Sequence, residues 1–153
     1  MDRVSVAVAL GSNLGDRRSH LDFAAGRLRE LLSDLKISRY VETVPVGVPG
    51  PQPLYLNAAA VGETECDPQT LLEALLAIER ERGRERPFAN APRSLDLDLV
   101  LFGDVVMETA GLHVPHPRFR ERTFVLEPLA EIAPDLVDPV TGDTVARLWR
   151  GRR

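Results

Sequence analysis

Leucines alternate with other residues through the segment 93–102, which reads Arg-Ser-Leu-Asp-Leu-Asp-Leu-Val-Leu-Phe. This period of two predicts a strand with one apolar face, formed by the leucines. Asp96 and Asp98 then project from the opposite face, about 6.5–7 Å apart along the backbone. Val100 and Phe102 continue the aspartate face, so this face is not simply solvent. Two carboxylates beside apolar neighbours need a counter-charge, and Mg²⁺ suits their hard oxygen ligands. The alternative for Asp-x-Asp alone is a solvated strand face paired with nearby arginines.

Upstream of this strand, the hydrophobic pattern predicts three further strands and two amphipathic helices. The strands are expected at 4–10, 37–43 and 54–62, and the helices at 17–35, capped by Asp16, and from Pro68, capped by Asp67. The resulting order, β-α-β-β-α-β, predicts an α+β fold: a ferredoxin-like antiparallel sheet with the helices packed mainly on one face. We expect the first and fourth strands to be central, so that the loop after strand one and the aspartates face a common cleft.

After the aspartate strand the pattern is weaker. Gly103 and Asp104 predict a turn, followed by a short hairpin with residues 105–107. Residues 122–133 are expected to be helical, and the tail to Arg153 completes a C-terminal extension.

Composition narrows the class of protein. A chain of 153 residues with 44% hydrophobic and 27% charged residues predicts one globular domain over 1–153. The net charge of −4 argues against a broad nucleic-acid footprint. Cys66 is the sole cysteine, so an internal disulfide or a cysteine metal cluster is excluded. The first residues show neither a signal peptide nor a membrane span, and we expect a cytoplasmic protein without membrane partners.

The basic residues are nearly all arginine, since Lys36 is the only lysine among 19. No Gly-Lys-Ser/Thr motif occurs, so arginine must bind any phosphate here. Arg84, Arg86 and Arg93 lie in a proline-containing loop that leads directly into the aspartate strand. Basic and acidic groups aimed at one cleft fit a polyphosphate and metal lying between them.

Several segments together carry a resemblance to a known family. The segment 91–103, Ala-Pro-Arg-Ser-Leu-Asp-Leu-Asp-Leu-Val-Leu-Phe-Gly, resembles the signature of 6-hydroxymethyl-7,8-dihydropterin pyrophosphokinase, a folate-pathway enzyme. Five further segments resemble the same family in order: Gly-Ser-Asn-Leu at 11–14, Thr-Val-Pro-Val-Gly at 43–47, Tyr-Leu-Asn-Ala-Ala at 55–59, Val-Pro-His-Pro at 114–117 and Arg-Thr-Phe at 122–124. The resemblance covers about residues 4–140.

The resemblance implies transfer of diphosphate from ATP to the hydroxymethyl group of the pterin, with release of AMP, in folate biosynthesis. It implies that Asp96 and Asp98 hold two Mg²⁺ ions along the triphosphate. Arg84 and Arg93 would join them as catalytic residues, and Arg86, His116, Arg122 and Glu79 would contact ATP. For Glu79 a helix-surface ion pair is the alternative. With ATP and the pterin as its partners, we expect the protein to be a monomer.

The pterin, a flat polar heterocycle, needs aromatic faces and in-plane hydrogen bonds. By resemblance, Tyr55 and Phe124 stack on it, and Asn57 offers both a donor and an acceptor. The same resemblance adds Thr43, Val44, Pro45 and Val46 to the pterin site. Core packing is the alternative for Tyr55 and Phe124, whereas a buried Asn57 needs partners in any case.

The chain departs from the family pattern at Gly111 and His113, where an arginine and a hydroxyl residue are common. Part of the set of ATP contacts is therefore left open. Two other classes of function compete. A palm-like nucleotidyl transferase would also use strand carboxylates but leaves Tyr55, Asn57 and Phe124 unexplained. A non-enzymatic ferredoxin-like binding module would show no magnesium dependence.

Overall fold

The computed structural model describes residues 2–44, 54–82 and 94–151. Its centre is a five-stranded antiparallel sheet in the order β2-β4-β1-β5, with β3 also paired to β4. The strands are β1 (Val4–Ser12), β2 (Ser33–Ile37), β3 (Val41–Thr43), β4 (Tyr55–Thr64) and β5 (Asp96–Phe102). The α+β class and the antiparallel sheet are confirmed.

The prediction is wrong for one of the two strands expected at the centre of the sheet. β1 and β4 are central, while β5, the aspartate strand, lies at the edge. The reason is that β4 pairs along the whole of one edge of β1, from Val4↔Thr64 to Ser12↔Leu56. β5 is left with the other edge of β1, and its own outer edge faces other elements.

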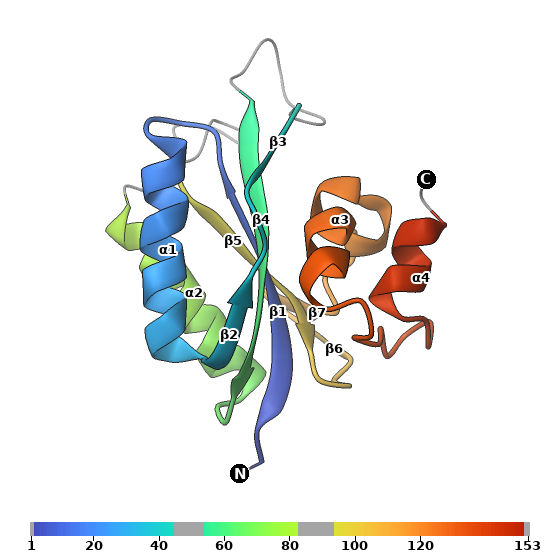
Figure 1. Cartoon of the computed structure of the whole chain (residues 1–153). Coiled ribbons are helices and arrows are strands. Elements are labelled where there is room, and N and C mark those ends of the chain that lie inside the picture. The colour runs from blue at the N-terminus through green and yellow to red at the C-terminus, as the bar shows by residue number, and fades with distance from the viewer. Residues whose placement is uncertain (1, 45–53, 83–93, 152–153) are drawn as a thin grey trace.

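Two helices cover one face of the sheet, as predicted. α1 (Arg17–Leu31) and α2 (Pro68–Glu81) lie together on the left of the sheet in Figure 1 and bury their leucines against it. The predicted caps are confirmed, because Asp16 accepts from the Ser19 N–H and Asp67 from the Thr70 N–H. Each cap satisfies a backbone donor that the first helical turn leaves without an intrahelical acceptor.

The boundary after α1 differs from the prediction. The helix ends at Leu31 rather than at residue 35, and the chain enters β2 through Asp34, whose φ is +52°. Pairing of Lys36 with Val61 of β4 overrides the helical period of the leucines. Of the strand predicted at 37–43, Ile37 is the last residue of β2 and residues 41–43 form β3. Between them, the Ser38 hydroxyl accepts from the Ala59 N–H, while the Ser38 N–H donates to the Ala59 carbonyl.

The C-terminal extension covers part of the opposite face. It comprises β6 (Met107–Thr109), β7 (Leu112–Val114), a 3₁₀ turn (Phe119–Glu121), α3 (Thr123–Ile132) and α4 (Val145–Arg150). Figure 1 shows α3 and α4 across the sheet from α1 and α2. The turn after β5 is confirmed, but the hairpin expected with 105–107 is wrong: β6 pairs with β7 around Gly111. Trp149 packs against this second core.

A β-bulge at Val100 changes which residues of β5 share a face. Val8 pairs with Leu99 and Ala7 with Leu101, so Val100 is the extra residue. Val100 lies on the face expected for it, but Leu101 joins the core under α3 and Phe102 the core under α1 and α2. The prediction that Phe102 continues the aspartate face is therefore wrong, because strict alternation ends at the bulge.

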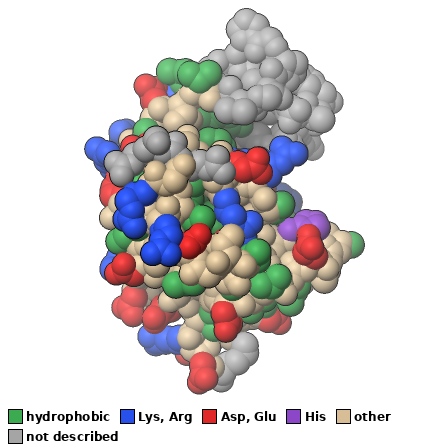
Figure 2. Space-filling model, turned by 90° about the vertical axis from the view of Figure 1, so that its right-hand side faces the viewer, with side chains coloured by type: hydrophobic (Ala, Val, Ile, Leu, Met, Phe, Trp, Pro, Cys, Tyr) green, Lys and Arg blue, Asp and Glu red, His purple; other side chains and the backbone are tan. Residues whose placement is uncertain are grey.

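The surface above α3 and α4 mixes charges of both signs. Figure 2, which shows this face, has basic and acidic side chains interspersed rather than gathered by sign. Among the residues that the structure describes, no helix is both long and apolar enough to cross a membrane.

A hydrogen-bonded ion pair between Arg120 and Asp138 connects two segments of the C-terminal extension. Asp138 is fully buried, accepts from Arg120 at 2.5 and 2.9 Å, and also accepts from the Val140 N–H and the Thr141 hydroxyl. Burial alone would raise the pKa of Asp138, but these donors outweigh it and lower the pKa. The pair joins the 3₁₀ turn to the segment before α4.

We predict that Asp138→Asn lowers the free energy of unfolding at pH 7 by about 1.5–3 kcal/mol, because the buried side chain at this position loses its charge-assisted hydrogen bonds with the partly exposed Arg120. A carboxyl with a depressed folded pKa stabilises above its unfolded value of about 3.9. The difference between wild type and variant, measured by urea unfolding, should thus stay constant from pH 7 to about pH 5 and shrink below about pH 4. Asp143→Asn, which removes the exposed ion pair with Arg147, is the matched control and should change little. A pH-independent difference for Asp138→Asn would contradict the prediction.

Candidate active site

One row of residues crosses four strands on the face opposite α1 and α2. Val41 of β3 pairs with Asn57 of β4, Asn57 with Gly11 of β1, and Gly11 with Asp96 of β5. Directly paired residues in an antiparallel sheet project to the same face. The register therefore brings Asn57 and Asp96 onto one surface, two strands or about 10 Å apart.

The polar end of this row is built around Asn57. Its side-chain amide is buried and donates to the Thr43 hydroxyl at 2.5 Å. A Cβ on Gly11 would lie 3.3 Å from Oδ1 of Asn57 and 3.5 Å from the ring of Tyr55. Three of the residues predicted for the pterin site, Thr43, Tyr55 and Asn57, are thus brought together, and the buried amide has the partner that it needs.

The two aspartates lie on the same face, as predicted. Asp96 pairs with Gly11 and Asp98 with Ala9, without a register shift between them, and both side chains are half-buried. Ala9 also pairs with Ala59 of β4, so the residues beside Asp98 on this face have small side chains. Within the described part of the chain, no group of three or more acidic, histidine or cysteine side chains forms a metal site. The pair fits Mg²⁺ that takes its remaining ligands from phosphate and water.

His116 lies beside the outer edge of β5, where its backbone N–H donates to the Val100 carbonyl at 2.9 Å. Burial, and secondarily the charge of Arg122, lowers its pKa to about 4, while Asp96 opposes this shift. His116 is therefore neutral at pH 7. Its Nδ1 accepts from the Arg118 N–H at 3.2 Å, which leaves the ring proton on Nε2 as a donor. Arg122 and Asp96 therefore lie close enough to His116 for their charges to affect its pKa.

Arg122 and Phe124 enter the site from the start of α3. The Arg122 guanidinium lies over the Phe124 ring at 5.6 Å from its centroid, and Phe124 packs at the margin of the core beneath α3. Phe124 is thus partly packed in the core, which was the alternative role considered for it.

Glu79, predicted to contact ATP, lies on α2, behind the aspartate strand. Its Oε2 accepts a hydrogen bond of 2.7 Å from the Leu97 N–H. This contact is to the backbone of the residue between the two aspartates, and the sequence pattern does not predict it.

With the geometry in place, comparison with known proteins decides the family. The sequence profile of 7,8-dihydro-6-hydroxymethylpterin-pyrophosphokinase matches residues 7–134. The chain belongs to this family. It is 42% identical over 142 residues to the 2-amino-4-hydroxy-6-hydroxymethyldihydropteridine pyrophosphokinase of Synechocystis, covering 92% of this chain and 72% of that protein. It is 41% identical over 149 residues to the pyrophosphokinase of the same name in Bacillus subtilis, covering 94% and 89%.

A solved structure shares the fold. The crystal structure of Plasmodium falciparum HPPK-DHPS superposes with a TM-score of 0.74 at 15% identity, over 98% of this chain and 45% of that one. The chain therefore spans less than half of that longer protein.

Some predicted site residues of this pyrophosphokinase chain are not placed. Pro45, Val46, Arg84, Arg86 and Arg93 lie outside the described residues. Val44 is placed and is 71% exposed at the end of the strand segment that carries Thr43.

The two departures from the family pattern lie on the β6–β7 hairpin. Gly111 forms its turn with φ +88°, and His113 is half-exposed and lies 3.4 Å from Glu108, its cross-strand partner.

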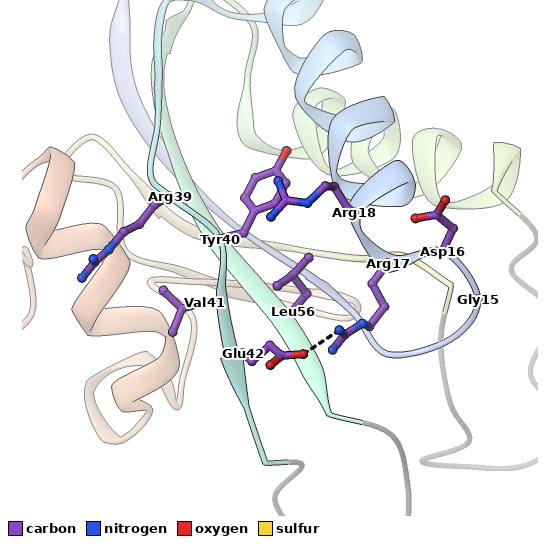
Figure 3. Close-up of a pocket in the computed structure, with 9 residues that line it drawn as sticks. All are labelled: Gly15, Asp16, Arg17, Arg18, Arg39, Tyr40, Val41, Glu42 and Leu56. Carbon is purple, nitrogen blue, oxygen red and sulfur yellow. Dashed lines mark hydrogen bonds and ion pairs between the residues drawn. The ribbon is translucent and has the colours of Figure 1, made fainter.

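A separate pocket lies between the start of α1 and β3 (Figure 3). Its arginines have partners: Arg17 binds Glu42 at 2.6 Å and the Leu54 carbonyl at 2.8 Å, and Arg18 stacks on Tyr40. Alternation along β3 and β4 turns Glu42 and Leu56 toward this pocket and Thr43, Tyr55 and Asn57 to the other face. None of the predicted site residues lines it.

Gly11 belongs to the site but was not predicted from the sequence as a site residue. The predicted strand ended at Leu10, whereas β1 continues to Ser12 and carries Gly11 between Asn57 and Asp96. A glycine within a strand pattern marks close approach of another group, and that signal was present.

We predict that the His116 ring titrates near pH 4 rather than near 6.5, because burial and Arg122 disfavour its charged form. The measurement is a ¹⁵N-histidine NMR titration of the unligated protein, with His116→Gln identifying the signal. The ¹⁵N shifts should show the Nε2–H form throughout the neutral range. A midpoint near 6.5 would contradict the burial argument.

Proposed function

We propose that this chain transfers diphosphate from ATP to the hydroxymethyl oxygen of 6-hydroxymethyl-7,8-dihydropterin, releases AMP, and serves folate biosynthesis. Membership of the pyrophosphokinase family supports the activity. The observation that carries it in the structure is the single row Asn57–Gly11–Asp96, which sets an amide suited to a heterocycle beside a carboxylate suited to a metal–phosphate complex.

The pterin half of the proposal uses the surface of β3 and β4. Asn57 presents an amide beside Thr43, and Tyr55 and Phe124 supply aromatic faces, whose offset stacking adds about 0.5–1.5 kcal/mol beyond area burial. Gly11 leaves open the space in front of Asn57 and Tyr55. By family match, Val44, Pro45 and Val46 would add further pterin contacts.

The phosphate half uses β5 and the segment that follows it. Asp96 and Asp98 would hold two Mg²⁺ ions, which would neutralise and orient the triphosphate oxygens when bound. His116 would donate from Nε2 as a neutral group, and Arg122 would add a fixed positive charge. By family match, Arg84, Arg86 and Arg93 would complete the phosphate contacts.

The chemistry is mainly positioning and charge stabilisation. The hydroxymethyl oxygen attacks the β-phosphorus, the bond from that phosphorus to the α–β bridging oxygen breaks, and AMP leaves with the bridging oxygen. The row of paired strands fixes the distance between the heterocycle and the phosphates, so that the attacking oxygen is presented in line.

We further propose a single domain over residues 1–153, acting as a cytoplasmic monomer with ATP and the pterin as partners. Both cores pack on the same sheet, which supports one domain. Cys66 is the sole cysteine, and its lack of a disulfide partner is typical of a reducing compartment.

We predict that Asp96→Asn and Asp98→Asn each lower kcat by about 10³-fold or more, since each removes a charged oxygen ligand from the phosphate-binding metal site. The assay contains ATP, Mg²⁺ and the reduced hydroxymethylpterin, with nucleotide products separated by chromatography. Wild type should form AMP and the pterin diphosphate in equal amounts. Asp104→Asn, in the exposed turn after β5, is the matched control and should keep full activity.

Other products would point to other reactions. ADP instead of AMP would rule out diphosphate transfer, and release of inorganic pyrophosphate would indicate the nucleotidyl transferase. Full activity of both aspartate variants would overturn the metal assignment.

We predict that Gly11→Ala weakens pterin binding about tenfold, equivalent to about 1.4 kcal/mol, because the added methyl group presses on Asn57 and Tyr55. Calorimetric titration with the pterin and, separately, with a Mg²⁺-loaded non-hydrolysable ATP analogue should show a loss for the pterin alone. Gly26→Ala on α1, where a Cβ meets nothing within 4 Å, is the control and should bind both ligands normally. Equal binding of the pterin by Gly11→Ala and wild type would show that the space at Gly11 is not used.

A further inference from the structure

The outer edge of β5 carries a hydrogen bond that the proposed reaction does not require. Among the described residues β5 is an edge strand, so the N–H groups on its outer side have no strand partner there. The Leu97 N–H is one of these, and it donates to Oε2 of Glu79 at 2.7 Å. A carboxylate acceptor makes this a charge-assisted bond, stronger than one between neutral groups.

The position of this bond along the strand is specific. Leu97 is the residue between Asp96 and Asp98, and successive residues of a strand turn their N–H groups to opposite edges. With the Leu97 N–H directed to Glu79, the N–H groups of Asp96 and Asp98 face β1. The backbone that carries both aspartates is therefore held from β1 on one edge and from α2 on the other.

Glu79 reaches the strand from the face opposite the aspartates. Its neighbour Ile78 is 2% exposed and belongs to the same apolar core as Leu97, which is 4% exposed. Asp96 and Asp98 project to the other face, together with Gly11 and Ala9. α2 thus places the Glu79 carboxylate at the outer edge of the strand, whereas the aspartate side chains project from the face that α2 does not cover.

We propose that Glu79 is a positioning residue for the metal-binding pair: it fixes the spacing and direction of Asp96 and Asp98 by anchoring the Leu97 N–H. This inference rests on the proposed function, in which those aspartates hold Mg²⁺ and the triphosphate. Glu79 acts through the strand backbone and not as a contact of ATP, in contrast to the role that the family resemblance implied.

The test compares Glu79→Gln, which keeps a side-chain acceptor without the charge, with Glu79→Ala, which removes the acceptor. Glu73→Ala is the matched control, because Glu73 is an exposed glutamate of the same helix that interacts with Gln69. Hydrogen exchange of the Leu97 amide is measured by NMR, and kcat, the KM for ATP and the Mg²⁺ concentration for half-maximal rate are measured on each protein.

We expect the Leu97 amide of Glu79→Ala to exchange about tenfold faster or more, since a hydrogen bond to a charged group is lost. Its kcat should fall about tenfold and its Mg²⁺ requirement rise, with the KM for the pterin unchanged. Glu79→Gln should recover most of the protection and most of the rate, and Glu73→Ala should match wild type.

Two results would overturn the proposal. One is a Glu79→Gln variant with a protected Leu97 amide and a rate as low as that of Glu79→Ala, which would mean that the charge acts directly on the nucleotide. The other is a Glu79→Ala variant with wild-type rate and Mg²⁺ dependence. Failure of the proposed function is distinct, because wild-type protein would then form no AMP while the exchange of Leu97 would still report the anchor.

Discussion

The pairing of β1 with β4 on one edge and β5 on the other is the constraint on which the candidate site depends. It sets Asn57, Gly11 and Asp96 in one row, although they are far apart in the chain. Gly11 leaves space within this row, since a Cβ there would lie 3.3 Å from Oδ1 of Asn57. A recognition group for a flat ring and a carboxylate for metal-bound phosphate thereby share one rigid surface, which is more exact than a loop would be.

The two faces of the sheet have different roles. α1 and α2 pack leucines against most of one face, and that core supplies the rigidity. The extension covers only part of the opposite face and leaves the aspartates half-buried. The bulge at Val100 sits just beyond Asp98 and lets Leu101 pack beneath α3 while Phe102 packs on the other face. One short strand can thus carry both site residues and core residues.

Charge in the site is arranged by burial as well as by residue type. His116 stays neutral because it is partly buried and near Arg122, so it offers a donor without adding a second positive charge. Arg120, two residues before Arg122, is committed to the buried Asp138 and holds the 3₁₀ turn to the extension. Of the arginines in this segment, Arg120 is therefore structural, whereas Arg122 lies near His116 and the aspartates.

The sequence by itself determined the elements and much of the chemistry. Period-two alternation placed Asp96 and Asp98 on one face, the helix caps at Asp16 and Asp67 were readable locally, and the ordered motifs indicated the family. These features depend on neighbours within a few residues. Tertiary structure decided the rest: the end of α1 at Leu31, the edge position of β5, the bulge at Val100 and the bond from Leu97 to Glu79. Each depends on which strand or helix lies alongside, and local periodicity carries no information about a partner many residues away.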